Sequence, residues 1–127
     1  MNNSVYILED RAVIYISGEE AKDFLQNLVS NDINRVTETS SCFASLLTPQ
    51  GKFLYEFIIV KHKLGFFIDC EKDQSKEILN QLNLYKIRSK VEILNLSNEF
   101  VVASFGYEKF LSIKGSKDSL GFTFKDR

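Results

Sequence analysis

The chain has 127 residues, enough for one domain that buries about two-thirds of the surface its unfolded form exposes. Its net charge of -1, from 16 basic and 17 acidic residues, excludes a general electrostatic attraction to nucleic acid or to an anionic membrane. No apolar run approaches the roughly 18 residues of a membrane span, and the first residues lack the features of a secretory signal. We therefore expect a cytoplasmic globular protein with no direct nucleic-acid or membrane partner.

The first part of the chain predicts two strands and a helix. Residues 5–8 (VYIL) and 12–16 (AVIYI) are rich in β-branched and aromatic residues, and the polar residues between them suggest an opening hairpin. Ser17 and Glu20 have the spacing of a capping box, and Asn31 is the expected end of the helix. The apolar stripe at helical spacing consists of Ala21, Phe24, Leu25, Leu28 and Val29.

The middle of the chain predicts three consecutive antiparallel strands. Residues 42–47 (CFASLL) and 52–60 (KFLYEFIIV) flank the turn sequence TPQG, residues 48–51. Proline presets φ at the second position of such a turn, and glycine relieves crowding at the fourth. Residues 65–70 (GFFIDC) return after a short turn, so the three strands should form a meander.

A second helix and further strands complete the prediction. Asp73 is a candidate N-cap of that helix. Its apolar face would be formed by Ile78, Leu79, Leu82 and Tyr85. Residues 90–94 (KVEIL) and 100–105 (FVVASF) resemble strands, and the tail from Gly106 holds short β-like pieces. Because short turns join most strands, we predict a single α+β domain over residues 1–127, a largely antiparallel sheet with two packed helices.

Metal and thiol chemistry has little support in the sequence. Cys42 and Cys70 stand far apart, with no second cysteine or histidine at ligand spacing, and His62 is the only histidine. We therefore predict no metal site. Both cysteines are expected to be small core residues of the predicted strands.

Glu56 is the unusual residue of the strand predicted over residues 52–60. Side-chain alternation puts it on one face with Leu54 and Ile58, and puts Tyr55 on the other. A buried carboxylate is costly unless it is paired or hydrogen-bonded. Two interpretations stay open: Glu56 lies at an open sheet edge or pairs with a lysine across the strand, or it serves a ligand as hydrogen-bond acceptor or proton-transfer group.

The sequence YKIRSK, residues 85–90, brings three cations close together. In an extended conformation Lys86, Arg88 and Lys90 would share one face, which suits the binding of carboxylates or phosphates. Alternatively, these cations close the preceding helix, where they are favourable beside the C-terminal end of its dipole. The two interpretations are compatible.

Four blocks of the chain carry a family resemblance: ISGEEAKDFLQNLVSNDI, LLTPQGKFLYEFII, FIDCEKD and YKIRSKVEI. Their order and spacing resemble the N-terminal part of the YgfZ-type folate-binding proteins, relatives of the T-protein (aminomethyltransferase) of the glycine cleavage system. The resemblance covers residues 5–105 and implies the first, folate-binding domain of the T-protein fold. It also implies tetrahydrofolate or a derivative as ligand, and a role in making or repairing iron-sulfur enzymes, including one that modifies tRNA.

The resemblance implies site residues as well. T-proteins carry two adjacent aspartates on the strand after the glycine turn, the second of which orients the folate and is important in catalysis. Those positions hold Tyr55 and Glu56 here. A folate-contacting tyrosine matches Phe43, which keeps a stacking face without the hydroxyl. A folate-side asparagine matches Asp69, which only accepts hydrogen bonds when it is ionised.

The predicted site therefore has Glu56 as its candidate catalytic acid. Because folates end in one or more glutamates, the three cations of residues 86–90 are candidates for holding that tail. The full cofactor-binding set is Phe43, Tyr55, Glu56, Asp69, Lys86, Arg88 and Lys90.

One feature of the YgfZ branch is not reached. Its Lys-Gly-Cys-Tyr-x-Gly-Gln-Glu-type motif lies in the later half of those proteins, and this chain stops at FTFKDR. We therefore expect either the N-terminal part of a longer chain or a reduced member. Missing C-terminal domains, or self-association, would then cover an exposed apolar surface.

Three functions follow from the resemblance. The first is a tetrahydrofolate-binding module that supports iron-sulfur client proteins and is not an enzyme by itself. The second is half of a folate-dependent aminomethyltransferase-type enzyme with Glu56 as its acid. The third is a structural domain that has lost its ligand.

Overall fold

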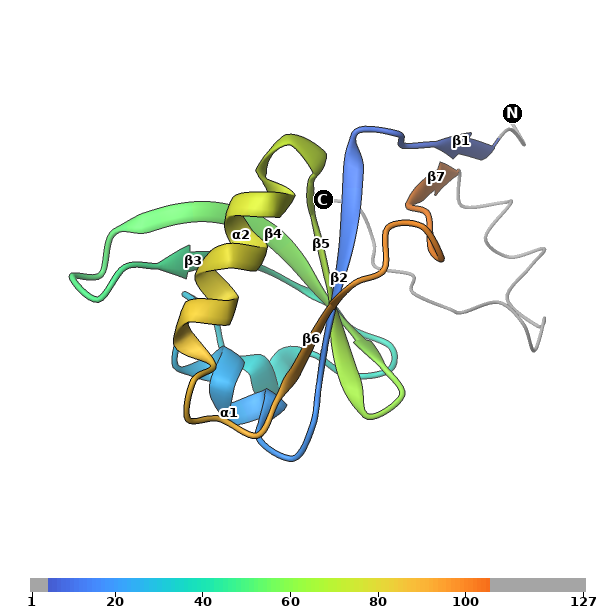
Figure 1. Ribbon diagram of the computed structural model, residues 1–127. Helices are drawn as coiled ribbons and strands as arrows, with labels where there is room; N and C mark the ends of the chain where they lie inside the picture. Colours follow the sequence, from blue (N-terminus) through green and yellow to red (C-terminus); the bar gives the residue numbers. More distant parts are fainter. Residues whose placement is uncertain (1–4, 106–127) are drawn as a thin grey trace.

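The computed structural model describes residues 5–105 (Figure 1). Its strands are β1 (Val5–Ile7), β2 (Arg11–Ser17), β3 (Cys42–Leu47), β4 (Phe53–His62), β5 (Gly65–Glu71), β6 (Glu92–Asn95) and β7 (Ala103–Phe105). Its helices are α1 (Ala21–Gln26), the short 3-10 helix η1 (Ile33–Arg35) and α2 (Lys72–Tyr85). The β-like pieces predicted from Gly106 onward lie outside the described residues.

The main sheet has five antiparallel strands in the order β3-β4-β5-β2-β6. This confirms the predicted α+β class and the meander β3-β4-β5. The turn over residues 48–51 forms as its sequence predicts, because the Gly51 N–H donates to the Thr48 carbonyl at 2.9 Å. The Lys52 N–H also donates to Thr48 Oγ1 at 3.0 Å, and Gly51 has a φ of 83°.

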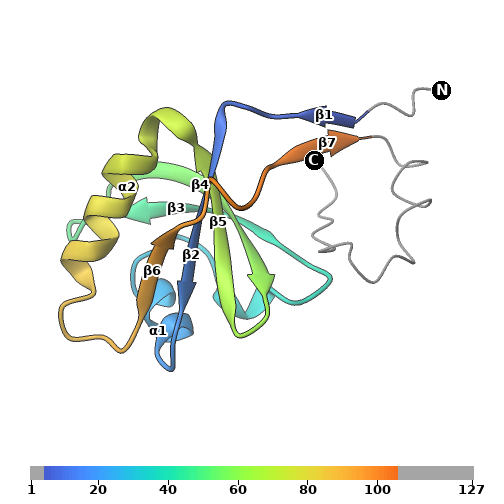
Figure 2. The same ribbon diagram turned by 45° about the vertical axis from the view of Figure 1, so that its right-hand side comes forward.

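The predicted opening hairpin is wrong. Strand β1 pairs with β7, and together they form a separate two-stranded ribbon at the opposite end of the molecule from α2 (Figure 2). After a turn closed by Arg11, whose N–H donates to the Leu8 carbonyl at 3.3 Å, β2 enters the main sheet between β5 and β6. Residues 12–14 and 16 of β2 are buried, because the side chains of this inner strand are covered on both faces of the sheet.

The helix starts differ from the sequence prediction, although the predicted apolar stripes are largely buried. Ser17 ends β2, and Glu20 is the N-cap of α1 without a side-chain hydrogen bond, so the capping box is wrong. Helix α1 also ends early, at Gln26. Helix α2 begins directly after β5 with Glu71 as N-cap, which places Asp73 in its first turn. Tertiary packing of the stripe, more than capping, therefore selects these helices.

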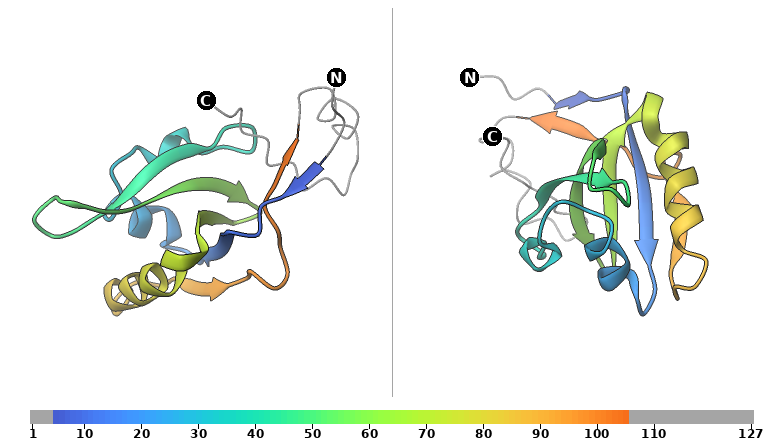
Figure 3. Two further views of the ribbon diagram at one scale, coloured as in Figure 1. Left: turned by 90° about the horizontal axis from the view of Figure 1, so that it is seen from above. Right: turned by 90° about the vertical axis from the view of Figure 1, so that its left-hand side faces the viewer.

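The core lies between the sheet and both helices, which contribute to one hydrophobic cluster (Figure 3). Its largest fully buried side chains are Ile14, Ile16, Leu25, Ile33, Leu46, Phe57, Ile59, Ile68, Ile78 and Leu82. The prediction that both cysteines belong to the core is confirmed, because Cys42 and Cys70 are 8% and 0% exposed. Burial raises the pKa of Cys70 to about 11, which keeps this thiol protonated and unreactive.

We call the other side of the main sheet the open face. The segment after β6 covers one end of it: Leu96, Phe100 and Val102 pack near Val13 and Phe67. The His62 ring adds to this cover by stacking on Phe67 with a centroid distance of 4.4 Å. The other end of the open face, over β3 and the first half of β4, lies outside this small cluster.

Candidate functional site

Three of the predicted ligand-binding residues come together on the open face. Phe43 of β3 lies opposite Ile58 of β4, and Ile58 lies opposite Asp69 of β5, so these residues form one row across three strands. Glu56 lies in the next row, opposite Ser45. Phe43 is 45% exposed. An aromatic surface, an aliphatic neighbour and two carboxylates therefore share one patch.

The structure answers why Glu56 stands in an apolar strand. The registered pairing of β4 with β5 begins at Phe57, so Glu56 lies just before that ladder, with its side chain exposed. Within residues 5–105 the ion pairs are Arg11–Asp69 and Lys90–Glu19, so the lysine pairing considered from the sequence is not seen. Glu56 is thus a solvated carboxylate beside the Phe43 row, available to a ligand.

Tyr55 lies on the opposite, helix-bearing face. Its hydroxyl donates to Glu77 Oε2 of α2 at 2.8 Å, and this hydrogen bond is the main cause that raises the pKa of Tyr55. The contact ties β4 to α2. Tyr55 therefore does not share the patch with Glu56, as strand alternation requires.

Asp69 has a partner that the sequence reasoning missed. Arg11 of β2 donates from Nε to Asp69 Oδ1 at 2.8 Å and from Nη2 to the Asp69 carbonyl at 2.9 Å. Burial raises the pKa of Asp69 above its ordinary value of 3.8, and the Arg11 hydrogen bond and charge offset part of that rise. Alternation along β2 could have placed Arg11 on the open face, but only the strand order brings it beside Asp69.

The cationic segment of residues 86–90 is not extended. Lys86 is the C-cap of α2 and donates its N–H to the Leu82 carbonyl at 3.1 Å, and the Ser89 N–H donates to the Lys86 carbonyl at 2.8 Å. Of the two interpretations, the extended row of Lys86, Arg88 and Lys90 is not seen, and Lys86 lies at the C-terminal end of α2, as the other interpretation expects. The segment leads into β6, the edge strand farthest from β3, so it lies away from Phe43. Its contact with a folate tail stays a prediction.

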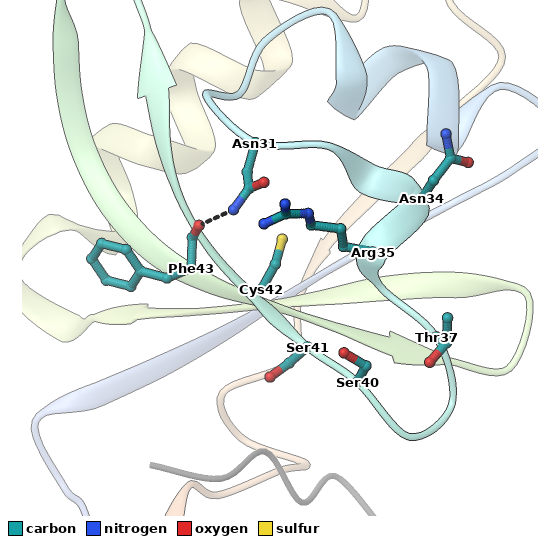
Figure 4. Close-up of a pocket in the computed structure, with 8 residues that line it drawn as sticks. All are labelled: Asn31, Asn34, Arg35, Thr37, Ser40, Ser41, Cys42 and Phe43. Carbon is teal, nitrogen blue, oxygen red and sulfur yellow. Dashed lines mark hydrogen bonds between the residues drawn. The ribbon is translucent and has the colours of Figure 1, made fainter. Parts of the chain in front are cut away.

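A shallow hollow adjoins the other side of β3 (Figure 4). Its lining residues are Asn31, Asn34, Arg35, Thr37, Ser40, Ser41, Cys42 and Phe43. The Asn31 side chain donates to the Phe43 carbonyl at 2.9 Å, and Figure 4 shows the Phe43 ring turned away from Arg35. The hollow is therefore distinct from the patch that the Phe43 ring faces.

In residues 5–105 there is no group of three or more His, Cys, Asp or Glu side chains that could hold a metal ion. Within the same range no helix is long and apolar enough to cross a membrane. Neither result assigns a function. The candidate site is the patch of Phe43, Glu56 and Asp69, which the strand register brings together on the open face.

Comparison with solved structures identifies the fold. The chain resembles the crystal structure of glycine cleavage system aminomethyltransferase T from Bartonella henselae, with a TM-score of 0.66 at 15% identity. The match covers 73% of this chain and 26% of that one. The main sheet and its two helices therefore have a T-protein-like fold.

Sequence relatives give the family. The chain is 30% identical over 99 residues to "Iron-sulfur cluster assembly factor IBA57 homolog, mitochondrial" of Neurospora crassa, over 72% of this chain and 23% of the relative. It is 31% identical over 113 residues to "tRNA-modifying protein YgfZ" of Buchnera aphidicola, over 88% and 35%. An aminomethyltransferase of Caldanaerobacter subterraneus is 27% identical over 92 residues, covering 68% and 23%. No protein-family model matches the chain.

Fold and sequence together define a member of the glycine cleavage T-protein superfamily. Within that superfamily the chain belongs to the YgfZ type. It spans between 23% and 35% of the length of these three relatives.

Proposed function

We propose that this chain is the tetrahydrofolate-binding module of a YgfZ-like protein that serves iron-sulfur enzymes. The observation that carries the proposal is the common placement of Phe43, Glu56 and Asp69 on the open face. A pterin ring stacks well on an exposed aromatic side chain, and its N–H groups match carboxylate acceptors. The three residue types therefore fit a flat ligand that is rich in hydrogen-bond donors.

The cellular role is proposed from the names of the relatives. One relative is named as an iron-sulfur cluster assembly factor and another as a tRNA-modifying protein. Iron-sulfur client proteins are accordingly the partners we propose, with tRNA modification as an indirect effect. The assembly-factor relative is named as mitochondrial, so the cytoplasmic location stays a prediction.

The open geometry favours a binding module over an independent enzyme. Group transfer requires the donor to be aligned with the folate nitrogen and shielded from water. Glu56 is exposed, and Phe43 is 45% exposed, so residues 5–105 supply one wall of such a site. Half of an aminomethyltransferase-type enzyme is the second candidate, because one relative carries that name. An aminomethyl-transfer assay on the 127-residue chain separates the two, since we expect no turnover.

Calorimetry with tetrahydrofolate tests the binding proposal. We expect Glu56→Gln to weaken binding roughly 10- to 100-fold, since a hydrogen bond to a charged group contributes about 1.5–3 kcal/mol. Glu92→Gln is the matched control, because it makes the same charge change at an exposed position of β6, the far edge strand. Equal affinity of wild type and Glu56→Gln would remove Glu56 from the site. Absence of binding by the wild type would refute the proposed function.

A further inference from the structure

The Arg11–Asp69 contact is an ion pair on the open face that is reinforced by a second hydrogen bond. Both hydrogen bonds come from one guanidinium and reach one residue, at 2.8 Å to the carboxylate and 2.9 Å to the carbonyl. The side chains are 21% and 9% exposed, so solvent competes little for them. In the strand register Arg11 lies opposite Glu71, so its side chain turns diagonally toward Asp69 instead.

This contact leaves one oxygen of Asp69 available. Arg11 uses Oδ1 and the main-chain oxygen of Asp69, and no hydrogen bond within residues 5–105 reaches Oδ2. No buried side-chain nitrogen or oxygen of the described residues lacks a partner. Oδ2 must therefore retain contact with solvent. The carboxylate is thus held on one side and can accept a hydrogen bond on the other.

The surroundings of Asp69 make Arg11 necessary for its charge. Val13 of β2 and Ile58 of β4 lie directly opposite it and are apolar. Two acidic residues, Glu56 of β4 and Glu71 of β5, lie on the same face as Asp69. Asp10, in the turn before β2, raises the pKa of Asp69 further. Arg11 is the cation that lowers the pKa of Asp69 against the effects of burial and of Asp10.

We propose that Arg11 is a positioning residue of the ligand site. It holds the Asp69 carboxylate in its acceptor form and fixes its orientation, so that Oδ2 accepts a hydrogen bond from an N–H of the bound folate. The inference rests on the proposed function and adds a residue and a role to it. Without Arg11 the pKa of Asp69 would be higher, so its carboxyl would take up a proton at a higher pH and then lose its match to an N–H donor.

The pH dependence of tetrahydrofolate binding tests the role of Arg11. In the wild type, affinity should fall as the pH drops through the pKa of Asp69. In Arg11→Gln that fall should begin at a higher pH, with a roughly tenfold loss of affinity at mildly acidic pH, about the value of one charged hydrogen bond. Arg11→Lys should restore most of the pH profile. Asp69→Asn should bind tetrahydrofolate with an affinity that does not change over this pH range, because asparagine has no carboxyl group to titrate.

The carboxyl titration of Asp69, followed by carbon-13 NMR in the free protein, gives a second measurement that needs no ligand. A higher pKa in Arg11→Gln than in wild type is expected, and an unchanged pKa would overturn the inference. If Arg11 had only a structural role, Arg11→Gln would lower the free energy of unfolding without moving the pH profile of binding. If the wild type binds and Glu56→Gln weakens binding, but Arg11→Gln keeps the wild-type profile, only this inference fails. If the wild type does not bind, both proposals fail.

Discussion

Gly18 directly follows β2, and Gly51 lies in the turn before β4. The two glycines offer a matched test of how tightly the main chain packs at the end of β2. Both have positive φ, 116° and 83°, a region that other residues rarely adopt. A Cβ at Gly18 would lie 2.5 Å from the Lys90 carbonyl oxygen and 3.0 Å from the Val91 Cα. A Cβ at Gly51 would meet nothing within 4 Å. Substitution by alanine therefore imposes backbone strain at both sites, and a clash with main chain only at Gly18.

The expected magnitudes follow from this difference. Gly51→Ala should lower the free energy of unfolding by about 1–2 kcal/mol, the cost of a left-handed conformation. Gly18→Ala should cost about 1–3 kcal/mol more, the usual range for forcing extra atoms into a packed region. It would also displace the Lys90 carbonyl, which accepts the Glu20 N–H at 3.3 Å. The junction of β2, α1 and β6 should loosen as a result.

Urea unfolding of the 127-residue chain, followed by circular dichroism, measures both variants. The midpoint should shift more for Gly18→Ala than for Gly51→Ala, at an unchanged slope. Equal losses would show that backbone strain, and not the approach of Lys90 to Gly18, limits this junction. A larger loss for Gly51→Ala would refute the steric argument altogether.

Two further predictions concern charged groups. Burial, with a smaller effect of Lys63, lowers the pKa of His62 below 6.5. The stability that the neutral ring contributes is therefore complete above 6.5 and is lost as the pH falls from there through the lowered pKa of the folded state. His62→Phe should flatten this acid-side loss in urea titrations, and an unchanged slope would contradict it. Neutralising Lys86 and Arg88 with glutamine should reduce the preference for polyglutamylated over monoglutamylated tetrahydrofolate at low salt, because the predicted contact with the folate tail is a pairing of exposed charges. An unchanged preference would leave these cations with a helix-end role only.

Local chemistry explains which elements could be predicted. The turn at TPQG, residues 48–51, is held by hydrogen bonds among residues 48–52, so the hairpin β3-β4 follows from local sequence. The helical spacing of apolar residues such as Phe24 and Leu25 predicted the buried face of α1, because the residues that a helix buries recur at helical spacing in the sequence. The capping box failed because Ser17 is used as a strand residue. The opening hairpin was wrong because β1 pairs with β7 instead, and no local signal reports partners at opposite ends of the described chain.

The sequence by itself determined the class of fold, the meander, the burial of both cysteines and the alternation that separates Tyr55 from Glu56, because each depends on near neighbours in the chain. Only the tertiary structure decided what surrounds the candidate acids. The strand order β3-β4-β5-β2 lines up Phe43, Ile58 and Asp69 and brings Arg11 beside Asp69. Strand order and register are set by contacts between residues far apart in sequence, so residue spacing alone could not supply them.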